Sequence, residues 1–286
     1  MPNPPARSRR RAAACIVIDV GNTSTSIGRW DGRRVTRLSA VRGGIAHPAE
    51  AAAALDRAGA ATAGAAILAS VVPAANDAWA WLLRRLYGLR LEVLTHETPL
   101  PIAVDYPHPE QIGADRLCDA VGAFARHGAP VAVADFGTAL TFDVVDARGA
   151  YIGGLIAPGL PLMTGYLHEK TAKLPAVDLA GPSPAWGDST ENAMRLGARY
   201  GHRGMVREIL GFIRGRTGPE TFCCATGGYA AWALEGVGGC AIEPDLTLYG
   251  LGVIWSHARA VRRRGRTARA AARGRRACDL DRVPLE

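Results

Sequence analysis

The sequence has 286 residues, of which 48% are hydrophobic and 21% are charged, a balance that allows one large or two modest domains and excludes a chain that is disordered throughout. Its apolar stretches are all shorter than the ~20 residues that span a bilayer, so we expect a soluble protein without a transmembrane helix. The net charge of +8 would suit a nucleic-acid partner only if it lay on the folded body.

Most of the positive charge lies at the two ends of the chain. Residues 1–11 contain four arginines and no acidic residue, and residues 259–286 contain ten arginines against three acidic residues. The body between them is slightly acidic, and we interpret both ends as solvated, disordered tails. Nucleic-acid binding is therefore not expected, although weak adhesion of the tails to RNA or to a membrane stays open.

The N-terminal arginines precede a short apolar run, Ala12 to Ile18, that superficially resembles a secretory signal. Asp19 ends this run too early and no cleavage-like segment follows, so we predict a cytoplasmic protein. The six cysteines form no C-x-x-C pair, which argues against a zinc site and against a disulfide framework. Most of them are expected to be reduced.

The first half of the chain is predicted to open with three strands in succession. They cover Cys15 to Ile18, Ser24 to Trp30 and Val35 to Val41, and Asp31-Gly32 is a typical hairpin turn between the last two. Further along the chain, the patterns indicate helices over Pro48 to Ala58, Asn76 to Tyr87 and Ile112 to His127, with strands over Ala65 to Val72 and Leu91 to Leu94.

The pattern then restarts at Val131. Strand, aspartate, glycine and threonine follow one another in residues 16–23 and again in residues 131–138, and the second copy also continues into a hairpin, Thr141 to Asp146 and Tyr151 to Ile156. A repeat of this size indicates duplication of a whole lobe. The remaining predicted elements are a long helix over Ser189 to Arg214, a strand over Phe222 to Ala225 and a closing helix over Leu246 to Arg262. We therefore expect an α/β protein whose two similar lobes face each other across a cleft.

Each copy of the repeat places an aspartate and a glycine where a buried strand turns into a hairpin. Glycine lets the backbone approach an anion, successive amides form a concave nest for phosphate, and the aspartate can hold Mg²⁺ directly or through water. A single Asp-x-Gly is equally well an ordinary turn, but two copies in equivalent positions favour a hinged pair that grips ATP. A P-loop and a Rossmann fingerprint are both absent from the sequence.

Two further segments carry candidate chemistry. In Gly113-Ala114-Asp115-Arg116, the arginine could bind a substrate carboxylate bidentately, and Asp115 could accept the proton of an attacking hydroxyl. An aspartate that only favours the helix dipole is the alternative. Thr226-Gly227-Gly228 follows a strand, and its glycines would let an adenine lie against the backbone, although strand-Gly-Gly-helix is also a common connection.

Together these segments resemble type III pantothenate kinase, a family of the acetate kinase, sugar kinase, Hsp70 and actin superfamily, from about Ile16 to Gly252. The resemblance implies two duplicated ribonuclease H-like (actin-like ATPase) lobes around a nucleotide cleft. The motifs that carry it are Asp-Val-Gly-Asn-Thr at 19–23, Ser-Val-Val-Pro at 70–73, Tyr106 with Pro109, Gly-Ala-Asp-Arg at 113–116, Asp-Phe-Gly-Thr-Ala at 135–139, Gly-Gly-x-Ile-Ala-Pro-Gly at 153–159, Thr-Ala-Lys-Leu-Pro at 171–175 and Thr-Gly-Gly at 226–228.

The resemblance implies that this chain transfers the γ-phosphoryl group of ATP to pantothenate, the first step of coenzyme A biosynthesis, with Asp115 as the proton acceptor. It also implies a homodimer that meets along the long helical stretch, and Mg²⁺ with ATP. Asp135 is expected to ligate a monovalent cation, K⁺ or NH₄⁺. The expected ATP-binding residues are Asp19, Val20, Gly21, Asn22, Thr23, Ser24, Thr25, Ser26, Thr138, Gly227 and Gly228. The expected pantothenate-binding residues are Tyr106, Gly113, Ala114, Asp115, Arg116 and Thr190.

The sequence departs from the family pattern at two positions and at its ends. Leu140 stands where a second threonine is common, and Ser24 stands where asparagine is frequent, so we expect one hydroxyl fewer in the second hairpin. We divide the chain into a basic tail (1–12), an N-terminal lobe (13–128), a C-terminal lobe (129–260) and an Arg-rich tail (261–286). A kinase of another small hydroxy acid, and a regulatory accessory protein of the same fold, remain as alternatives.

Overall fold

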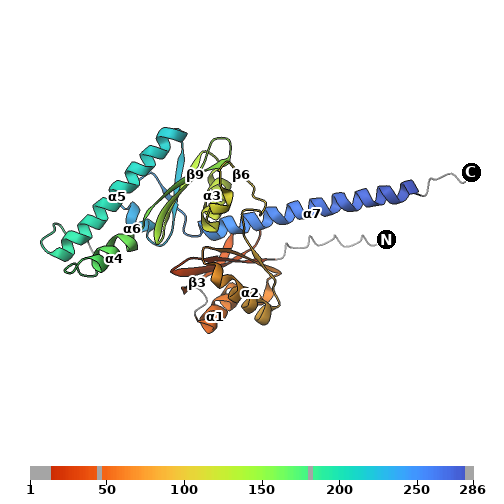
Figure 1. The fold of residues 1–286 in the computed structure, drawn as a ribbon, viewed down its shortest axis with the longest axis horizontal. Helices are drawn as coiled ribbons and strands as arrows, with labels where there is room; N and C mark the ends of the chain where they lie inside the picture. The colour runs from red at the N-terminus through yellow and green to blue at the C-terminus, as the bar shows by residue number, and fades with distance from the viewer. Residues whose placement is uncertain (1–13, 44–46, 180–182, 281–286) are drawn as a thin grey trace, which may run out of the picture.

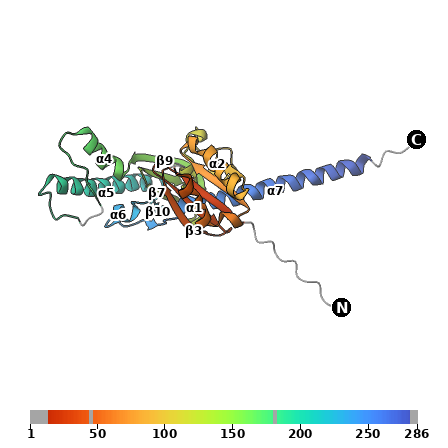
Figure 2. The ribbon, with the colours of Figure 1, turned by 90° about the horizontal axis from the view of Figure 1, so that it is seen from below.

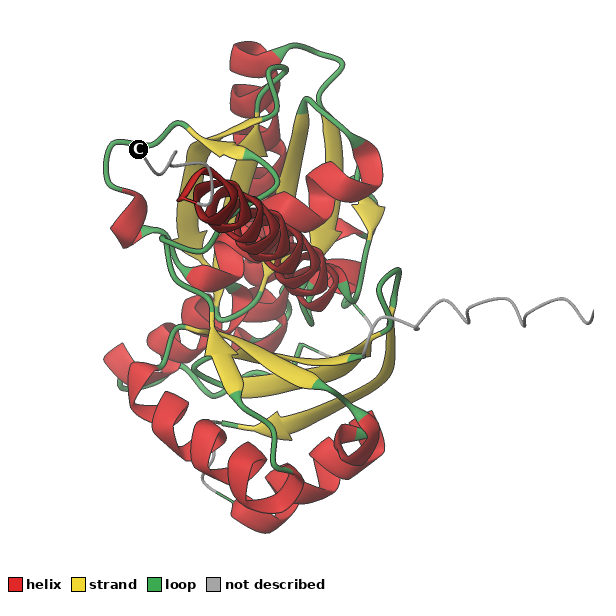
Figure 3. Ribbon diagram, turned by 90° about the vertical axis from the view of Figure 1, so that its right-hand side faces the viewer, coloured by secondary structure: helices red, strands yellow, loops and turns green. Residues whose placement is uncertain are grey.

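The computed structural model describes residues 14–43, 47–179 and 183–280 and contains two β-sheets with helices on both sides of each (Figures 1 and 3). The first sheet has the strand order β3-β2-β1-β4-β5, and the second has the order β11-β10-β7-β8-β9-β6. Each sheet starts from an antiparallel hairpin pair, β1 with β2 and β7 with β8, and continues with a parallel neighbour, β4 or β10. The sheets therefore repeat one topology, as the duplicated motifs predict.

The elements of the first sheet follow the predicted order closely. Pro73 at the start of α2 supplies a preset backbone angle where no amide partner is needed. Gly59 and Gly88, both in the left-handed conformation, end α1 and α2. The elements are β1 (Cys15–Val20), β2 (Ser24–Trp30), β3 (Val35–Arg42), α1 (Pro48–Ala58), a 3₁₀ turn η1 (Ala60–Thr62), β4 (Ala65–Ser70), α2 (Pro73–Tyr87) and β5 (Leu91–Val93).

The second sheet and its helices occupy most of the remaining chain. Ser189 begins the long helix α5, because its side chain accepts a hydrogen bond from the amide of Asn192 at 3.2 Å. The elements are β6 (Ala103–Val104), a 3₁₀ turn η2 (Pro109–Gln111), α3 (Ala114–His127), β7 (Val131–Phe136), β8 (Ala139–Val145), β9 (Ala150–Pro158), α4 (Leu160–Lys170), α5 (Thr190–Thr217), β10 (Phe222–Thr226), α6 (Ala230–Leu234), β11 (Ala241–Ile242) and α7 (Leu246–Leu280).

Three hydrophobic cores arrange these elements in layers. Helices α3 and α7 lie between the two sheets, where one core joins Val17 of β1 to Val133 of β7. A second core packs α1 and α2 on the other face of the first sheet, and Figure 3 shows helices covering that outer side. A third core packs α5 and α6 on the outer face of the second sheet. Each strand therefore presents alternate residues to the middle layer and to an outer layer.

Helices α3 and α7 approach each other closely in the middle layer. A Cβ at Gly122 would lie 2.8 Å from the carbonyl oxygen of Leu246, and one at Gly250 would collide with the carbonyl of Cys118. Glycine is required at this crossing because the backbones almost touch. Helix α3 also packs against β7 and β8, while α7 packs against β1, β2 and β4. The division of the chain at residue 128 is not tested by this packing and stays a prediction.

The closing helix is longer than predicted. It continues past Arg262 to Leu280, so residues 261–280 form helix where we expected a disordered tail, because alanine and arginine are both strong helix formers. Figures 1 and 2 show this end of α7 projecting away from the two sheets. The N-terminal arginines lie outside the described residues. Within the described part of the chain, no helix has the length and apolar character needed to cross a membrane.

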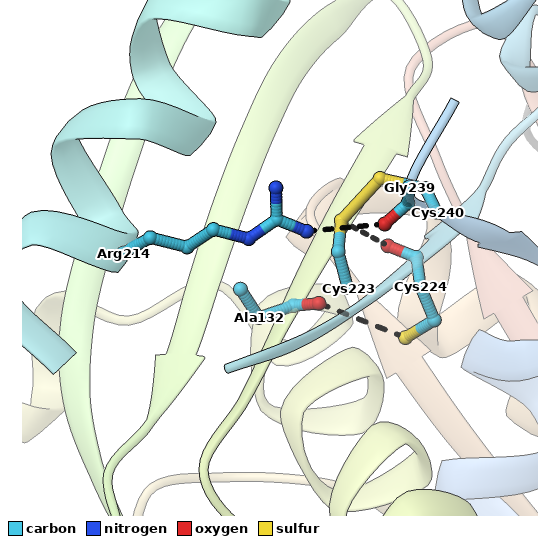
Figure 4. The surroundings of a disulfide bond; sticks show 6 residues. All are labelled: Ala132, Arg214, Cys223, Cys224, Gly239 and Cys240. Atoms are coloured by element: carbon cyan, nitrogen blue, oxygen red, sulfur yellow. Dashed lines mark hydrogen bonds between the residues drawn. A yellow bond between two sulfur atoms is a disulfide. The ribbon is translucent and has the colours of Figure 1, made fainter. Parts of the chain in front are cut away.

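The structure also contains one disulfide bond that the cysteine spacing does not indicate. Cys223 in β10 is joined to Cys240, the residue before β11, with 4.7 Å between their Cα atoms (Figure 4). Cys15, Cys118 and Cys224 are free and buried. The absence of a C-x-x-C pair does not exclude this disulfide, because the parallel pairing of β10 with β11 brings together two cysteines that are far apart in sequence.

Candidate active site

A cavity of about 820 Å³ lies between the two sheets. Its walls come from both hairpins, from the start of α3 and from the segment after β10. Four aspartates line it: Asp19 at the end of β1, Asp115 in the first turn of α3, Asp135 at the end of β7, and Asp245 just before α7. The fold therefore brings the two repeated motifs and the Gly-Ala-Asp-Arg segment to one place.

Strand alternation explains why Asp19 and Asp135 face the cavity. In β1, Ile16 and Ile18 pack in the outer core whereas Val17 packs in the middle layer, so Asp19 also points toward the middle layer. In β7, Val133 lies in the middle layer, and Asp135 follows it on the same face. Because side chains alternate with a period of two, each inward valine predicts an inward aspartate two residues later.

The two hairpin turns touch each other across the cavity. The hydroxyls of Thr23 and Thr138 form a hydrogen bond of 2.8 Å. The amide of Gly21 donates to the carbonyl of Ser24 at 3.0 Å, and the amide of Gly137 donates to the carbonyl of Ala139 at 3.1 Å. The second turn is thus one residue shorter than the first, but each contains a threonine that reaches the opposite lobe.

Asp115 is half-buried at the start of α3. Its Oδ1 accepts a hydrogen bond of 2.8 Å from the amide of Arg116. Burial is the main cause that raises the pKa of Asp115 above its ordinary value, and the hydrogen bond from this amide and the charge of Arg116 oppose the shift. A carboxylate with a raised pKa is a better proton acceptor than an ordinary aspartate.

Asp19 and Asp135 also resist ionisation. Burial, followed by the negative charges of Asp115 and Asp135, raises the pKa of Asp19 to about 8. Burial, followed by the charges of Asp115 and Asp143, raises the pKa of Asp135 to about 7. Like charges so close together cannot all ionise without a compensating cation, so the cavity is suited to a ligand that brings positive charge.

Arg116 does not face the cavity freely. Its Nη2 forms an ion pair of 2.8 Å with Oδ1 of Asp143 in β8, and the hydroxyl of Tyr151 donates to the same oxygen at 2.9 Å. Neither Asp143 nor Tyr151 is among our predicted site residues. The signal in the sequence is an aspartate inside an otherwise apolar strand, between Phe142 and Val144.

The predicted ATP-binding residues mostly line the cavity. Val20 and Thr25 do not, because both side chains point to the outer core of the first sheet, where the hydroxyl of Thr25 donates to the carbonyl of Gly43 at 2.9 Å. Those with a place in the cavity wall are Asp19, Gly21, Asn22, Thr23, Ser24, Ser26, Thr138, Gly227 and Gly228.

The predicted pantothenate-binding residues are only partly brought together. Asp115 lines the cavity, whereas Tyr106, Gly113, Ala114, Arg116 and Thr190 do not. Tyr106 lies against Tyr151, with 6.1 Å between ring centroids, and so borders the cluster around Arg116. Thr190 is exposed at the start of α5. These assignments stay predictions.

The missing hydroxyl at position 140 has a structural explanation. Leu140 is fully buried in the outer core of the second sheet, so a threonine at this position would point away from the cavity. Thr141, one residue later, lines the cavity instead. Thr226 of the Thr-Gly-Gly motif also lines the cavity, and so do Asp245 and Thr247 at the start of α7, which no motif indicates.

Comparisons with known proteins agree with this geometry. A family model described as type III pantothenate kinase matches residues 15–211. A type III pantothenate kinase of Akkermansia muciniphila is 47% identical over 189 residues, covering 65% of this chain and 76% of the relative. Those of Acidiphilium cryptum and Geobacter sulfurreducens are 38% identical over 244 residues and 34% identical over 252 residues, covering 82% and 85% of this chain and 92% and 99% of the relatives.

Solved structures support the fold alone, because their sequences are distant. A Baf family transcriptional activator from Campylobacter jejuni has a TM-score of 0.53 at 14% identity, covering 84% of this chain and 96% of that chain. Component A of (R)-2-hydroxyglutaryl-CoA dehydratase from Acidaminococcus fermentans has a TM-score of 0.51 at 15% identity, covering 87% and 99%. The predicted α/β architecture of two lobes around a cleft is confirmed.

Proposed function

The chain belongs to the type III pantothenate kinase family, and on this premise we propose that it transfers the γ-phosphoryl group of ATP to the primary hydroxyl of pantothenate, the first step of coenzyme A biosynthesis. The observation that carries the proposal is the position of Asp115, which shares one cavity with both repeated hairpins. Phosphoryl transfer needs a positioned acceptor hydroxyl beside a held γ-phosphate. A hydroxyl at Asp115 would meet that requirement.

Asp115 would accept the proton of the pantothenate hydroxyl. Because the transition state of phosphoryl transfer is loose, the hydroxyl loses its proton late, and position matters more than basicity. The raised pKa of Asp115 helps in the same direction. Arg116 donates its backbone amide to this carboxylate and thereby fixes one of its two oxygens.

The two turns would hold the phosphates of ATP. Ser24 and Ser26 lie on the cavity side of β2, and Thr23 and Thr138 meet between the lobes. Gly227 and Gly228 form a wall without side chains, against which the adenine would lie. Asp19 and Asp135, whose pKa values are raised by burial and by neighbouring negative charges, suit a divalent cation that travels with the phosphates. Such a cation neutralises charge on the transferring group.

The monovalent cation expected at Asp135 is a separate proposal. Within the described residues, no group of three or more His, Cys, Asp or Glu side chains is arranged to hold a metal ion. A K⁺ site at Asp135 would therefore need backbone carbonyls or the phosphates of ATP as its other ligands. The dependence of turnover on K⁺ tests this point directly.

We also propose that the protein acts as a homodimer. Large apolar side chains are exposed on neighbouring elements of the second lobe, and exposed apolar surface of this kind marks association sites. They belong to β9, to α4, to the segment after α4 and to α5: Ile156, Leu162, Tyr166, Trp186 and Tyr200. Sedimentation of the wild type and of Tyr200→Glu tests the proposal, because a dimer through this face dissociates when a charge is placed in it.

A coupled assay of ADP release with pantothenate, Mg²⁺ and K⁺ tests the proposed reaction. Turnover with pantothenate, and none with other small hydroxy acids, is the expected result. Asp115→Asn should lower kcat by roughly 10²–10⁴-fold, the usual contribution of a general base, while the KM for ATP changes little. Near-normal kcat in this variant would remove Asp115 from the proposed role.

A further inference from the structure

A buried polar cluster lies beside the cavity without lining it. It consists of Arg116 from α3, Asp143 from β8 and Tyr151 from β9. Arg116 Nη2 lies 2.8 Å from Asp143 Oδ1, and the Tyr151 hydroxyl donates to the same oxygen at 2.9 Å. The side chains of Arg116 and Asp143 are only 12% and 1% exposed, and Tyr151 is fully buried. The cluster therefore joins the start of α3 to the second sheet.

This cluster is expected to contribute little net stability to the fold. A buried ion pair recovers little more than its desolvation cost, and apolar side chains of similar volume are often as stable. Asp143 Oδ2 and Arg116 Nε have no hydrogen-bond partner within the described residues, which adds to the cost. Asp143 faces the middle layer, whereas Phe142 and Val144 on either side of it face the outer core, so an apolar residue at 143 would have neighbours to pack against. Fold stability alone therefore does not explain why an ion pair occupies this position.

The first turn of α3 has few other polar attachments. The residue that begins the helix, Gly113, has no side chain to cap the first amides, and no side-chain cap is present. Glycine also gives this junction more conformational freedom than any other residue. Leu117 of this turn packs in the middle-layer core, and Arg116 adds a polar attachment to the sheet through Asp143. The same residue donates its backbone amide to Asp115 Oδ1 at 2.8 Å.

We propose that Asp143, supported by Tyr151, is a positioning residue for phosphoryl transfer: it holds the guanidinium of Arg116 against β8 and thereby fixes the Asp115 carboxylate at the acceptor site. This inference rests on the proposed function, since it assigns Asp143 to the same reaction. Asp143 and Tyr151 touch neither substrate in this arrangement. Their effect passes through Arg116 and the first turn of α3.

A double-mutant cycle tests whether Asp143 acts through Arg116. Asp143→Asn should lower kcat with pantothenate about tenfold or more, the usual consequence of losing a charge-assisted hydrogen bond, and should leave the KM for ATP within twofold of wild type. In an Arg116→Met background, Asp143→Asn should change kcat by less than twofold, because the residue that it positions is already gone. A full additional loss in that background would overturn the proposal.

Two further variants separate positioning from a general loss of structure. Tyr151→Phe keeps the ion pair and removes one hydrogen bond, so it should lower kcat less than Asp143→Asn does. Asp146→Asn is the matched control, because Asp146 is an acidic residue of the same hairpin that accepts hydrogen bonds from the turn amides of Arg148 and Ala150. Its kcat should stay within twofold of wild type, and an equal loss in this control would assign the effect to the hairpin as a whole.

Hydrogen exchange supplies a readout that does not depend on activity. In Asp143→Asn, the amides of residues 114–118 should exchange at least tenfold faster than in wild type, while those of α2 should be unchanged. Unchanged exchange at 114–118 would refute the positioning role. If Asp143→Asn shows this faster exchange but the wild type does not turn over pantothenate, the proposed function fails and the anchoring of α3 by Asp143 stands.

Discussion

The hairpins β1–β2 and β7–β8 carry the same motif in different surroundings. Asp19 and Asp135 both end a buried strand and face the cavity, but Asp135 lies against Gly227, the residue after β10. Gly21 and Gly137, the glycines of the two turns, have no positive φ, whereas Gly227 has φ of +90°. The second hairpin thus has a close neighbour in a turn whose positive φ favours glycine.

This difference shows that a repeated motif specifies a turn but not the tightness of its surroundings. A Cβ at Gly21, in the first turn, would have one close neighbour, the carbonyl oxygen of Ser24 at 3.2 Å. The second hairpin lies against Gly227, which follows β10, and β10 is itself joined by the disulfide to the residue before β11. We therefore expect changes near the second hairpin to have larger effects than equivalent changes near the first.

The largest contrast is expected between Gly227→Ala and Gly21→Ala. An added Cβ at Gly227 would lie 2.6 Å from backbone atoms of Phe136, collide with the Asp135 carboxylate and require a left-handed backbone. This combination should cost roughly 2–5 kcal/mol of unfolding free energy and raise the KM for ATP. Gly21→Ala should cost less than about 1 kcal/mol. Denaturant unfolding of both variants measures the difference, and equal costs would mean that the two turns are equally constrained.

The disulfide should make the next largest contribution. It closes a sequence separation of 17 residues around α6, and the entropy of such a loop corresponds to about 3 kcal/mol. Reduction, or Cys223→Ala with Cys240→Ala, should lower the unfolding free energy by about this amount. In the double variant a reductant should have no further effect. If a reductant leaves the melting temperature of the wild type unchanged, the disulfide does not stabilise the fold.

The raised pKa values predict that the unliganded protein loses stability as the pH rises. A carboxyl group with a pKa near 4 in the unfolded chain and about 8 or 7 in the folded chain, as for Asp19 and Asp135, holds a proton only when folded in this interval. Its contribution is complete below about pH 4 and is lost as the pH passes the folded value. The melting temperature should therefore fall as the pH is raised from 5.5 to 8.5.

Substitution of each aspartate separates the two contributions to this pH dependence. Asp135→Asn should flatten the curve mainly below pH 7, and Asp19→Asn up to about pH 8, since these are the folded pKa values. Asp31→Asn is the control, because hydrogen bonds from the amides of Arg34 and Arg33 lower the pKa of this exposed carboxyl. A flat wild-type curve would contradict the raised values.

The smallest effect is expected from the threonine pair that joins the two turns. Thr23→Val or Thr138→Val removes the hydrogen bond of 2.8 Å and should raise the KM for ATP roughly 3- to 10-fold, in line with about 1 kcal/mol for one hydrogen bond. The double variant should be little worse than either single one, because both remove the same bond. Thr25→Val, two residues after Thr23 but facing the outer core, should leave the KM for ATP unchanged. Additive effects would mean that each hydroxyl acts alone.

Much of the fold could be predicted because strands and turns follow from local patterns. The alternation of apolar residues in β1 and β7 places Asp19 and Asp135 on the inner faces, and glycines and prolines mark the ends of α1, α2 and α3. The extension of α7 to Leu280 was missed, because the composition of the segment suits both a charged tail and a helix. Helix α4 and the two-residue strands β6 and β11 carry too few residues with a clear period to be recognised.

The sequence by itself determined which residues turn inward, because backbone geometry imposes a period of two on every strand. It also determined that an aspartate lies in the first turn of α3. Only the tertiary structure decided that Arg116 is bound to Asp143, that Cys223 meets Cys240 and that position 140 faces away from the cavity. Ion pairs and disulfides depend on which distant segments the packing brings together, and no local pattern encodes that distance.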